Sequence, residues 1–69
     1  MPLTFAKVGS CLMIKKVNGK DESKRYLESL GFIEGESVTV VNEIAGNFII
    51  NVKNTRIALD KTMACRIIV

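Results

Sequence analysis

Apolar and polar residues alternate along most of the chain after residue 36, which is the pattern of strands with one buried face. An earlier strand is predicted over Ser10–Val17, which is apolar from 11 to 14 and then turns basic. The apolar positions of period two in the later strands are Val38 and Val40, then Phe48, Ile50 and Val52, then Ile57 and Leu59, and finally Cys65, Ile67 and Val69.

A short helix is predicted over about Glu22–Leu30, with Asp21 as its N-cap. Tyr26, Leu27 and Leu30 fall on one face of this helix. A helix of this length is too short to be stable alone in water. We therefore expect it to be held by packing that face onto a sheet.

Two glycines are predicted to turn the chain after the helix. If Gly31 takes a left-handed conformation at the helix end, Phe32 and Leu27 form the hydrophobic contact of a Schellman cap. Ile33–Glu36 fits a type II turn, with Gly35 at the position that requires a positive φ. These two corners precede the first long strand.

The remaining connections show ordinary turn chemistry. Asn42–Asn47 is expected to be a hairpin loop with Ile44 at its tip, and Asn54-Thr55 a tight reversal. Asp60–Ala64 is expected to form one helical turn capped by Asp60. Short strands, tight turns and one short helix predict a mainly β fold, a small and strongly bent barrel of about five strands with the helix between the first and second strands.

The composition fits a single small domain. The 69 residues are 48% apolar with a net charge of +3, distributed as +4 over residues 1–25, −4 over 26–50 and +3 over 51–69. Such alternation is typical of a solvated surface. The apolar runs are too short to span a bilayer, and the first residues lack the features of a signal peptide. We expect a cytoplasmic protein that does not insert into the membrane.

Candidate chemistry is sparse. Cys11 and Cys65 lie in apolar stretches and are interpreted as reduced core thiols. The chain has no histidine, so the usual zinc sites cannot form, and a dedicated iron site is not expected. Neither a nucleophile elbow nor a phosphate loop is present. We expect no catalytic activity, no cofactor and no metal site.

The chain resembles the FeoA family of bacterial ferrous-iron-uptake proteins over nearly its whole length. The residues that carry this resemblance are Leu3, Gly9, the stretch 25–35 (RYLESLGFIEG), Val38-Thr39-Val40, Ile57-Ala58-Leu59 and 64–69 (ACRIIV). Glu34 and Asn54 depart from the family's preferred proline and glycine, and both turns tolerate the change. The resemblance implies one SH3-like domain over 1–69.

The resemblance also implies a cytosolic accessory of the FeoB membrane transporter, which carries a GTP-hydrolysing domain, or a relative of the C-terminal domain of iron-dependent repressors. The predicted contact residues are Arg25, Tyr26, Phe32, Ile33 and Glu34, with Ile44 as a second candidate. Tyr26 and Phe32 are equally compatible with a role in the core. The alternative is a nucleic-acid-binding barrel that contacts phosphates through Lys15, Lys16, Lys20, Lys24 and Arg25.

Nucleic acid is not the expected partner, because the chain lacks a run of stacking aromatic residues. Weak self-association is also compatible with the sequence. It would use an unpaired strand edge, either Ser10–Lys16 or Cys65–Val69.

Overall fold

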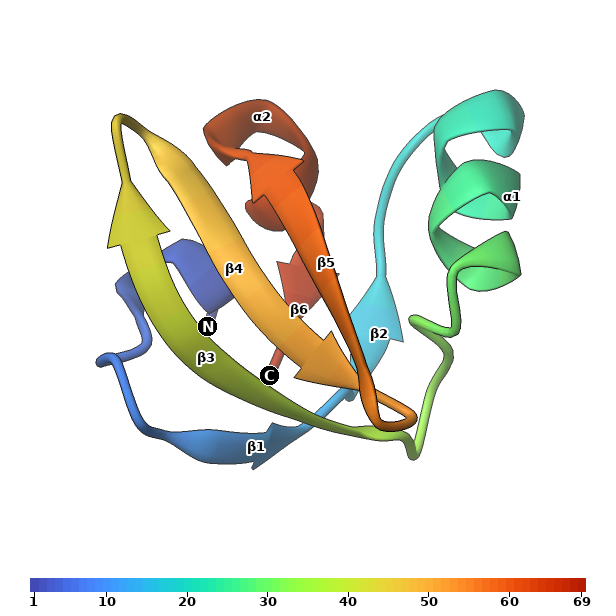
Figure 1. Ribbon diagram of the computed structural model, residues 1–69. Helices are drawn as coiled ribbons and strands as arrows, with labels where there is room; N and C mark the ends of the chain where they lie inside the picture. The colour runs from blue at the N-terminus through green and yellow to red at the C-terminus, as the bar shows by residue number, and fades with distance from the viewer.

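The computed structural model describes all 69 residues as two antiparallel sheets with two short helices (Figure 1). A four-stranded sheet has the order β1-β3-β4-β5, and a two-stranded sheet pairs β2 with β6. The elements along the chain are η1 (Leu3–Phe5), β1 (Cys11–Met13), β2 (Lys16–Val17), α1 (Asp21–Ser29), β3 (Ser37–Ile44), β4 (Asn47–Val52), β5 (Thr55–Asp60), α2 (Lys61–Ala64) and β6 (Ile67–Ile68).

The predicted first strand is in fact two strands. The chain breaks at Ile14, leaving β1 beside β3 and placing β2 beside β6. Backbone hydrogen bonds hold this corner: Ile14 donates to Glu36, and Gly35 donates back to Ile14. Ile14 is 1% exposed, so the corner also carries a core side chain. Helix α1 therefore follows β2 and connects the small sheet to the large one.

Two hairpins build the large sheet. The β3–β4 turn is Ala45-Gly46 and the β4–β5 turn is Lys53-Asn54, and all four residues have positive φ, as in the type I′ turns that suit the twist of paired strands. The second reversal thus lies one residue earlier than predicted.

The loop predicted over Asn42–Asn47 is wrong. Strand β3 continues to Ile44, which pairs with Asn47 across the two-residue turn. The register shifts between Val40 and Asn42, as at a β-bulge, so one extra residue fits into β3 without ending it. Ile44 is thus a strand residue, and it is 56% exposed.

The end of α1 has the predicted geometry. Gly31 has a φ of 107°, its amide donates to Glu28, and the Phe32 amide donates to Leu27, which completes a Schellman motif. Gly35 has a φ of 84°, and Glu36 donates to Ile33 at 3.1 Å, which is the predicted turn. The helix starts one residue earlier than expected, with Lys20 at the N-cap and no side-chain capping bond.

The core lies between the two sheets and consists entirely of apolar side chains. Its members are Leu3, Ile14, Val17, Leu27, Phe32, Val38, Val40, Phe48, Ile50, Val52, Leu59, Ala64, Ile67 and Val69. Leu27 is the only buried residue of α1, whereas Tyr26 is 55% exposed. The expected packing of this helical face is therefore correct only in part: Leu27 is buried and Leu30 packs against the core, whereas Tyr26 lies outside it.

The outer side of β5 carries no neighbouring strand. The strands therefore do not close into a continuous barrel. Figure 1 shows α1 standing beside this open side of β5, with the small sheet behind. No helix of the structure combines the length and the apolar character that crossing a membrane requires.

Candidate functional site

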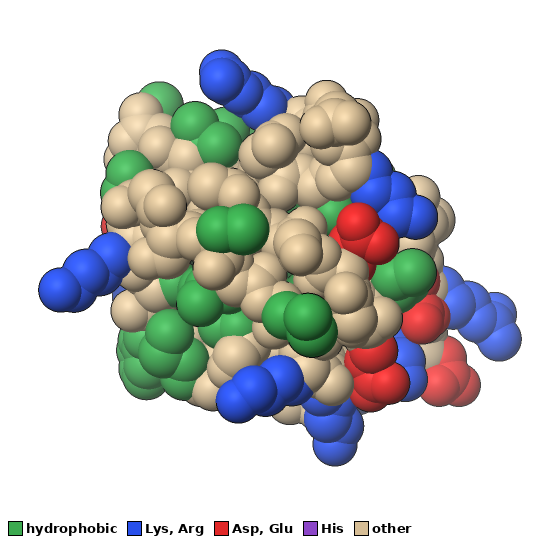
Figure 2. Space-filling view, turned by 90° about the horizontal axis from the view of Figure 1, so that it is seen from below, with side chains coloured by type: hydrophobic (Ala, Val, Ile, Leu, Met, Phe, Trp, Pro, Cys, Tyr) green, Lys and Arg blue, Asp and Glu red, His purple; other side chains and the backbone are tan.

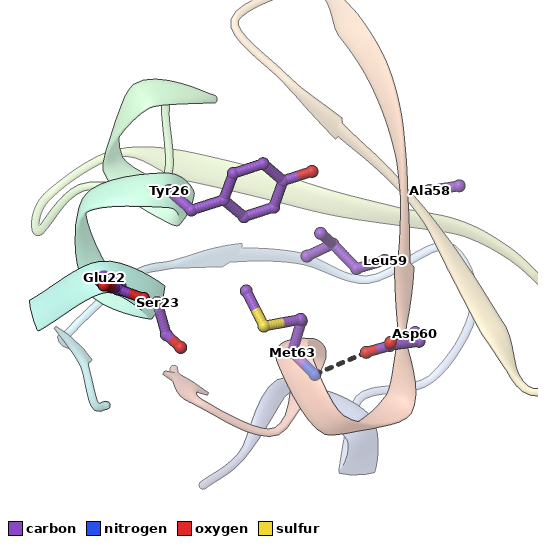
Figure 3. A pocket seen from close by; sticks show the side chains of 7 residues that line it. All are labelled: Glu22, Ser23, Tyr26, Ala58, Leu59, Asp60 and Met63. Atoms are coloured by element: carbon purple, nitrogen blue, oxygen red, sulfur yellow. Dashed lines mark hydrogen bonds between the residues drawn. The ribbon is translucent and has the colours of Figure 1, made fainter. Parts of the chain in front are cut away.

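A groove of about 410 Å³ separates α1 from the end of β5 and the start of α2. It is open to solvent, and Figure 3 shows Tyr26 on one wall with Leu59 and Met63 opposite it, while the Ala58 side chain points away from the groove. The lining residues are Glu22, Ser23, Tyr26, Ala58, Leu59, Asp60 and Met63. Its size is within the range of about 300–1,000 Å³ that is common for binding pockets.

Four apolar residues line the groove, and three of them, Tyr26, Leu59 and Met63, have large side chains. Tyr26 projects from α1, Leu59 points toward it from β5, and Met63 lies between them on α2 (Figure 3). Leu59 is 3% exposed and belongs to the core, so it forms a rigid floor. Tyr26 is more than half exposed, which leaves its ring available as a wall with an apolar face and a polar tip.

A short capped helix positions the polar edge of the groove. Asp60 ends β5, and its Oδ1 accepts a hydrogen bond from the Met63 amide at 2.8 Å, as predicted for an N-cap. The dashed line in Figure 3 marks this bond. Across the groove, Glu22 lies in the first turn of α1. Both charged residues of the lining are acidic, and no lysine or arginine lines the groove.

A smaller cleft of about 290 Å³ lies on the other side of α1. Its lining residues are Val17, Lys24, Glu28, Ile33 and Glu34. Charged side chains of both signs surround its two apolar members, and Ile33 is 38% exposed. The cleft is thus more polar than the groove. Figure 2 shows a face of the molecule on which acidic side chains gather at one side with basic ones among them, while hydrophobic side chains gather at the opposite side.

The structure separates the six residues predicted to contact a partner. Tyr26 lines the groove, whereas Ile33 and Glu34 line the cleft. Phe32 is fully buried beside Leu27, so the core interpretation is correct and its side chain presents no surface. The two others line neither hollow: Arg25 is exposed on α1, and Ile44 lies at the β3–β4 hairpin.

Of the groove, sequence reasoning named only Tyr26 as a contact residue and missed the six others, namely Glu22, Ser23, Ala58, Leu59, Asp60 and Met63. Leu59 and Asp60 were recognised only as a strand residue and a helix cap. The signal that could have found them is the strand–cap–helix step at Asp60, because it brings Met63 back beside the strand it has just left.

Both cysteines are exposed, so the expected core thiols are wrong. Cys11 lies on β1, and Cys65 follows α2, where its Sγ donates to the Thr62 carbonyl at 3.0 Å. The α2 turn rotates Cys65 away from the face shared by Ile67 and Val69, which are buried. No three cysteine, aspartate or glutamate side chains come together as a metal-binding group.

The FeoA domain family matches the chain over residues 1–69. A protein of Methanocaldococcus jannaschii, named as an Fe(2+) transport protein A, is 32% identical to this chain over 68 residues. The match covers 99% of this chain and 83% of the relative.

Solved structures agree with this match. A crystal structure of an iron uptake regulatory protein (FeoA) is 27% identical, with a TM-score of 0.88 over 96% of this chain and 88% of that one. The FeoA protein of Stenotrophomonas maltophilia, described as a prokaryotic SH3 domain protein complexed with zinc, is also 27% identical, with a TM-score of 0.87 over 99% and 87%. The predicted SH3-like fold is thereby confirmed, with β5 left open.

The same fold occurs inside larger proteins. A manganese-dependent transcriptional repressor is 18% identical, with a TM-score of 0.86 over 97% of this chain and 39% of that one. At this identity the likeness concerns the fold alone. The match over all 69 residues, the archaeal relative and the two solved structures together place this chain in the FeoA family.

Proposed function

We propose that this protein is an accessory of ferrous iron uptake that acts by binding another protein, the cytosolic region of a FeoB-type GTPase transporter. Membership of the FeoA family supports the iron-uptake role. The Stenotrophomonas relative has been put forward as a ferrous iron transport activating factor, and the archaeal relative is named for Fe(2+) transport. Binding a partner segment is also a common use of small β domains that carry a groove or an open strand edge.

The observation that carries the proposal is the groove beside α1. A half-exposed tyrosine forms its wall above the buried Leu59 and the half-buried Met63. Exposed aromatic side chains above an apolar floor are typical anchors of protein interfaces, because they bury a large area at little cost in side-chain entropy. The groove can receive one or two apolar side chains of a partner.

The charges of the groove favour a protein over a nucleic acid. Glu22 and Asp60 are the charged members of its lining, and both would repel a phosphate backbone. None of the basic residues of the predicted phosphate-binding face lines the groove. Lys15 precedes β2, Lys16 begins it and Lys20 precedes α1. Lys24 and Arg25 lie on α1 without lining the groove. The groove therefore suits a neutral or basic protein segment.

Calorimetry with the purified cytosolic region of the transporter tests the proposal. The wild-type protein is expected to bind with a dissociation constant in the micromolar range, as is common for transient complexes with small interfaces. Tyr26→Ala should weaken binding about tenfold, since removing an interface aromatic anchor commonly costs more than 1 kcal/mol.

Two control variants make this test specific. Val8→Ser and Ile44→Ser alter residues that are 58% and 56% exposed, close to the 55% of Tyr26, but neither lines the groove. Binding unchanged in both controls and weakened in Tyr26→Ala supports the groove. A loss with Ile44→Ser alone transfers the contact to the β3–β4 hairpin, and no binding at several hundred micromolar contradicts the proposed partner.

A further inference from the structure

We propose that β5 is an acceptor edge for strand addition: an extended segment of the partner pairs with the free side of β5 inside the groove, with an apolar side chain entering next to Leu59 and an adjacent lysine or arginine reaching Asp60. This inference rests on the proposed function and specifies how the partner binds. It depends on the hydrogen-bonding pattern of the β4–β5 hairpin and on the chemistry around β5.

The hairpin determines which backbone groups of β5 are free. A two-residue turn makes the residues that flank it, Val52 and Thr55, a hydrogen-bonded pair. Hydrogen-bonded pairs then recur at every second position, so the amides and carbonyls of Ile57 and Leu59 face β4. Those of Arg56 and Ala58 face the opposite way, toward the side of the sheet that has no strand.

These outward groups have no partner within the protein. None of the backbone hydrogen bonds formed outside the helices and strands involves Arg56 or Ala58. Ala58 is exposed and lines the groove, and its side chain points away from that space (Figure 3), so it is the backbone of Ala58 that borders the groove. An exposed edge with unpaired backbone groups is a ready template for another strand. The small side chain of Ala58 leaves the approach to this edge unobstructed.

The register of an added strand determines the side chains it needs. Residues that lie opposite each other in a sheet point to the same face. The residue opposite Leu59 would therefore point, like Leu59, toward Tyr26 and Met63 (Figure 3), where an aliphatic or aromatic side chain fits. The next residue would lie opposite Asp60, on the other face of the added strand.

Charge selects the second residue. Asp60 is exposed; its Oδ1 caps α2, whereas its Oδ2 takes part in no hydrogen bond of the protein. A lysine or arginine opposite Asp60 would form a cross-strand ion pair, and Glu22 across the groove adds to the negative potential. The preferred segment is thus an extended one in which an apolar residue adjoins a basic one.

Amide hydrogen exchange of the ¹⁵N-labelled protein, with tiled synthetic peptides of the transporter's cytosolic region, tests the edge directly. With saturating peptide, the Arg56 and Ala58 amides should exchange at least about tenfold more slowly, as expected when an exposed amide enters a sheet ladder. The Ile57 and Leu59 amides already face β4 and should change little. Side-chain docking alone would not produce this alternation, so its absence in a bound state overturns the inference.

Ala58→Pro is the matching variant, because it removes the outward amide without removing a bond to β4. Proline is tolerated on an edge strand when its nitrogen faces solvent. Affinity for the binding peptide should fall about tenfold or more with Ala58→Pro and stay within about threefold with Ala58→Thr, which keeps the amide. Asp60→Asn should weaken only peptides that contain the basic residue, since asparagine still caps α2.

The outcomes are distinguishable. If the transporter region binds Ala58→Pro as it binds the wild type, the edge is not used, and the proposed function stands. If neither the region nor any peptide binds the wild type, the proposed function and the inference both fail. If Ala58 becomes protected with rising protein concentration and no peptide, a second copy of the chain occupies the edge, and the assignment to the transporter is overturned.

Discussion

The amide of Phe32 donates a hydrogen bond to the carbonyl of Leu27 at 3.0 Å, across the end of α1. Both side chains are fully buried, so this bond joins the last turn of the helix to the core at two adjacent points. Since Leu27 is the only buried residue of α1, the position of the groove wall depends on this contact. The helix and the wall it carries are therefore only as stable as the cap.

Leu27→Ala should destabilise the protein strongly. Truncating a buried leucine costs about 2–5 kcal/mol, which is comparable to the total stability of a domain of this size. We expect the variant to be largely unfolded at room temperature by circular dichroism. Leu30→Ala, at a half-buried position of the same helix, should cost clearly less in urea unfolding. Equal losses in the two variants would contradict the role given to Leu27.

Gly31→Ala tests the backbone at the cap. The space is adequate, because an added Cβ would lie 3.5 Å from Lys53 Cδ and 3.6 Å from Val52 Cγ2. The φ of 107° is the difficulty, since residues with a Cβ avoid this region at a cost of about 1–2 kcal/mol. Urea unfolding should show a loss of that size. Lys24→Ala, on the exposed side of α1, should remain within about 0.5 kcal/mol of the wild type.

Asp60→Ala should lose the cap of α2 and, with it, the fixed position of Met63. The Met63 amide would be left without its 2.8 Å bond, and loss of an N-cap costs about 0.5–2 kcal/mol. Asp60→Asn keeps an acceptor oxygen and should retain most of the stability. Comparing the urea midpoints of the two variants separates the contribution of the capping hydrogen bond from that of the carboxylate charge. Equal losses in the two variants, both of which lack the charge, would show that the charge rather than the hydrogen bond stabilises this turn.

Cys11 and Cys65 should both react with iodoacetamide in the native protein, because both thiols are exposed. Mass spectrometry is expected to show two adducts without denaturant. Cys11→Ser and Cys65→Ser should each leave one adduct, which assigns the two reactions. If modification occurs only in urea, the thiols are covered in solution and the exposed positions described above are incorrect.

Local sequence chemistry predicted the corners of the fold well. Gly31 and Gly35 take the backbone conformations that the pattern requires, and Asp60 caps the turn expected of it. The alternation of Phe48, Ile50 and Val52 gives the buried face of β4. These features depend on residues a few positions apart, and the sequence carries their determinants locally.

Features that depend on distant partners were not predictable in the same way. The break at Ile14 depends on two strands far along the chain, because residues 11–13 pair with β3 and residues 16–17 pair with β6. The bulge near Val41 extends β3 past residues whose local preference is for a turn. The groove combines residues from α1, β5 and α2, so neither its acidic edge nor the exposure of Tyr26 follows from local pattern.

The pairing of β2 with β6 has a consequence for synthesis. Lys16 lies opposite Ile68 and Val17 opposite Ile67, so one of the two sheets cannot form until residue 68 has left the ribosome. Until then Val17 and Ile14 lack their final neighbours, and contacts between residues so far apart are slow to form. Nascent chains halted before residue 67 should accordingly remain sensitive to protease, however completely the β3–β4–β5 meander has already assembled.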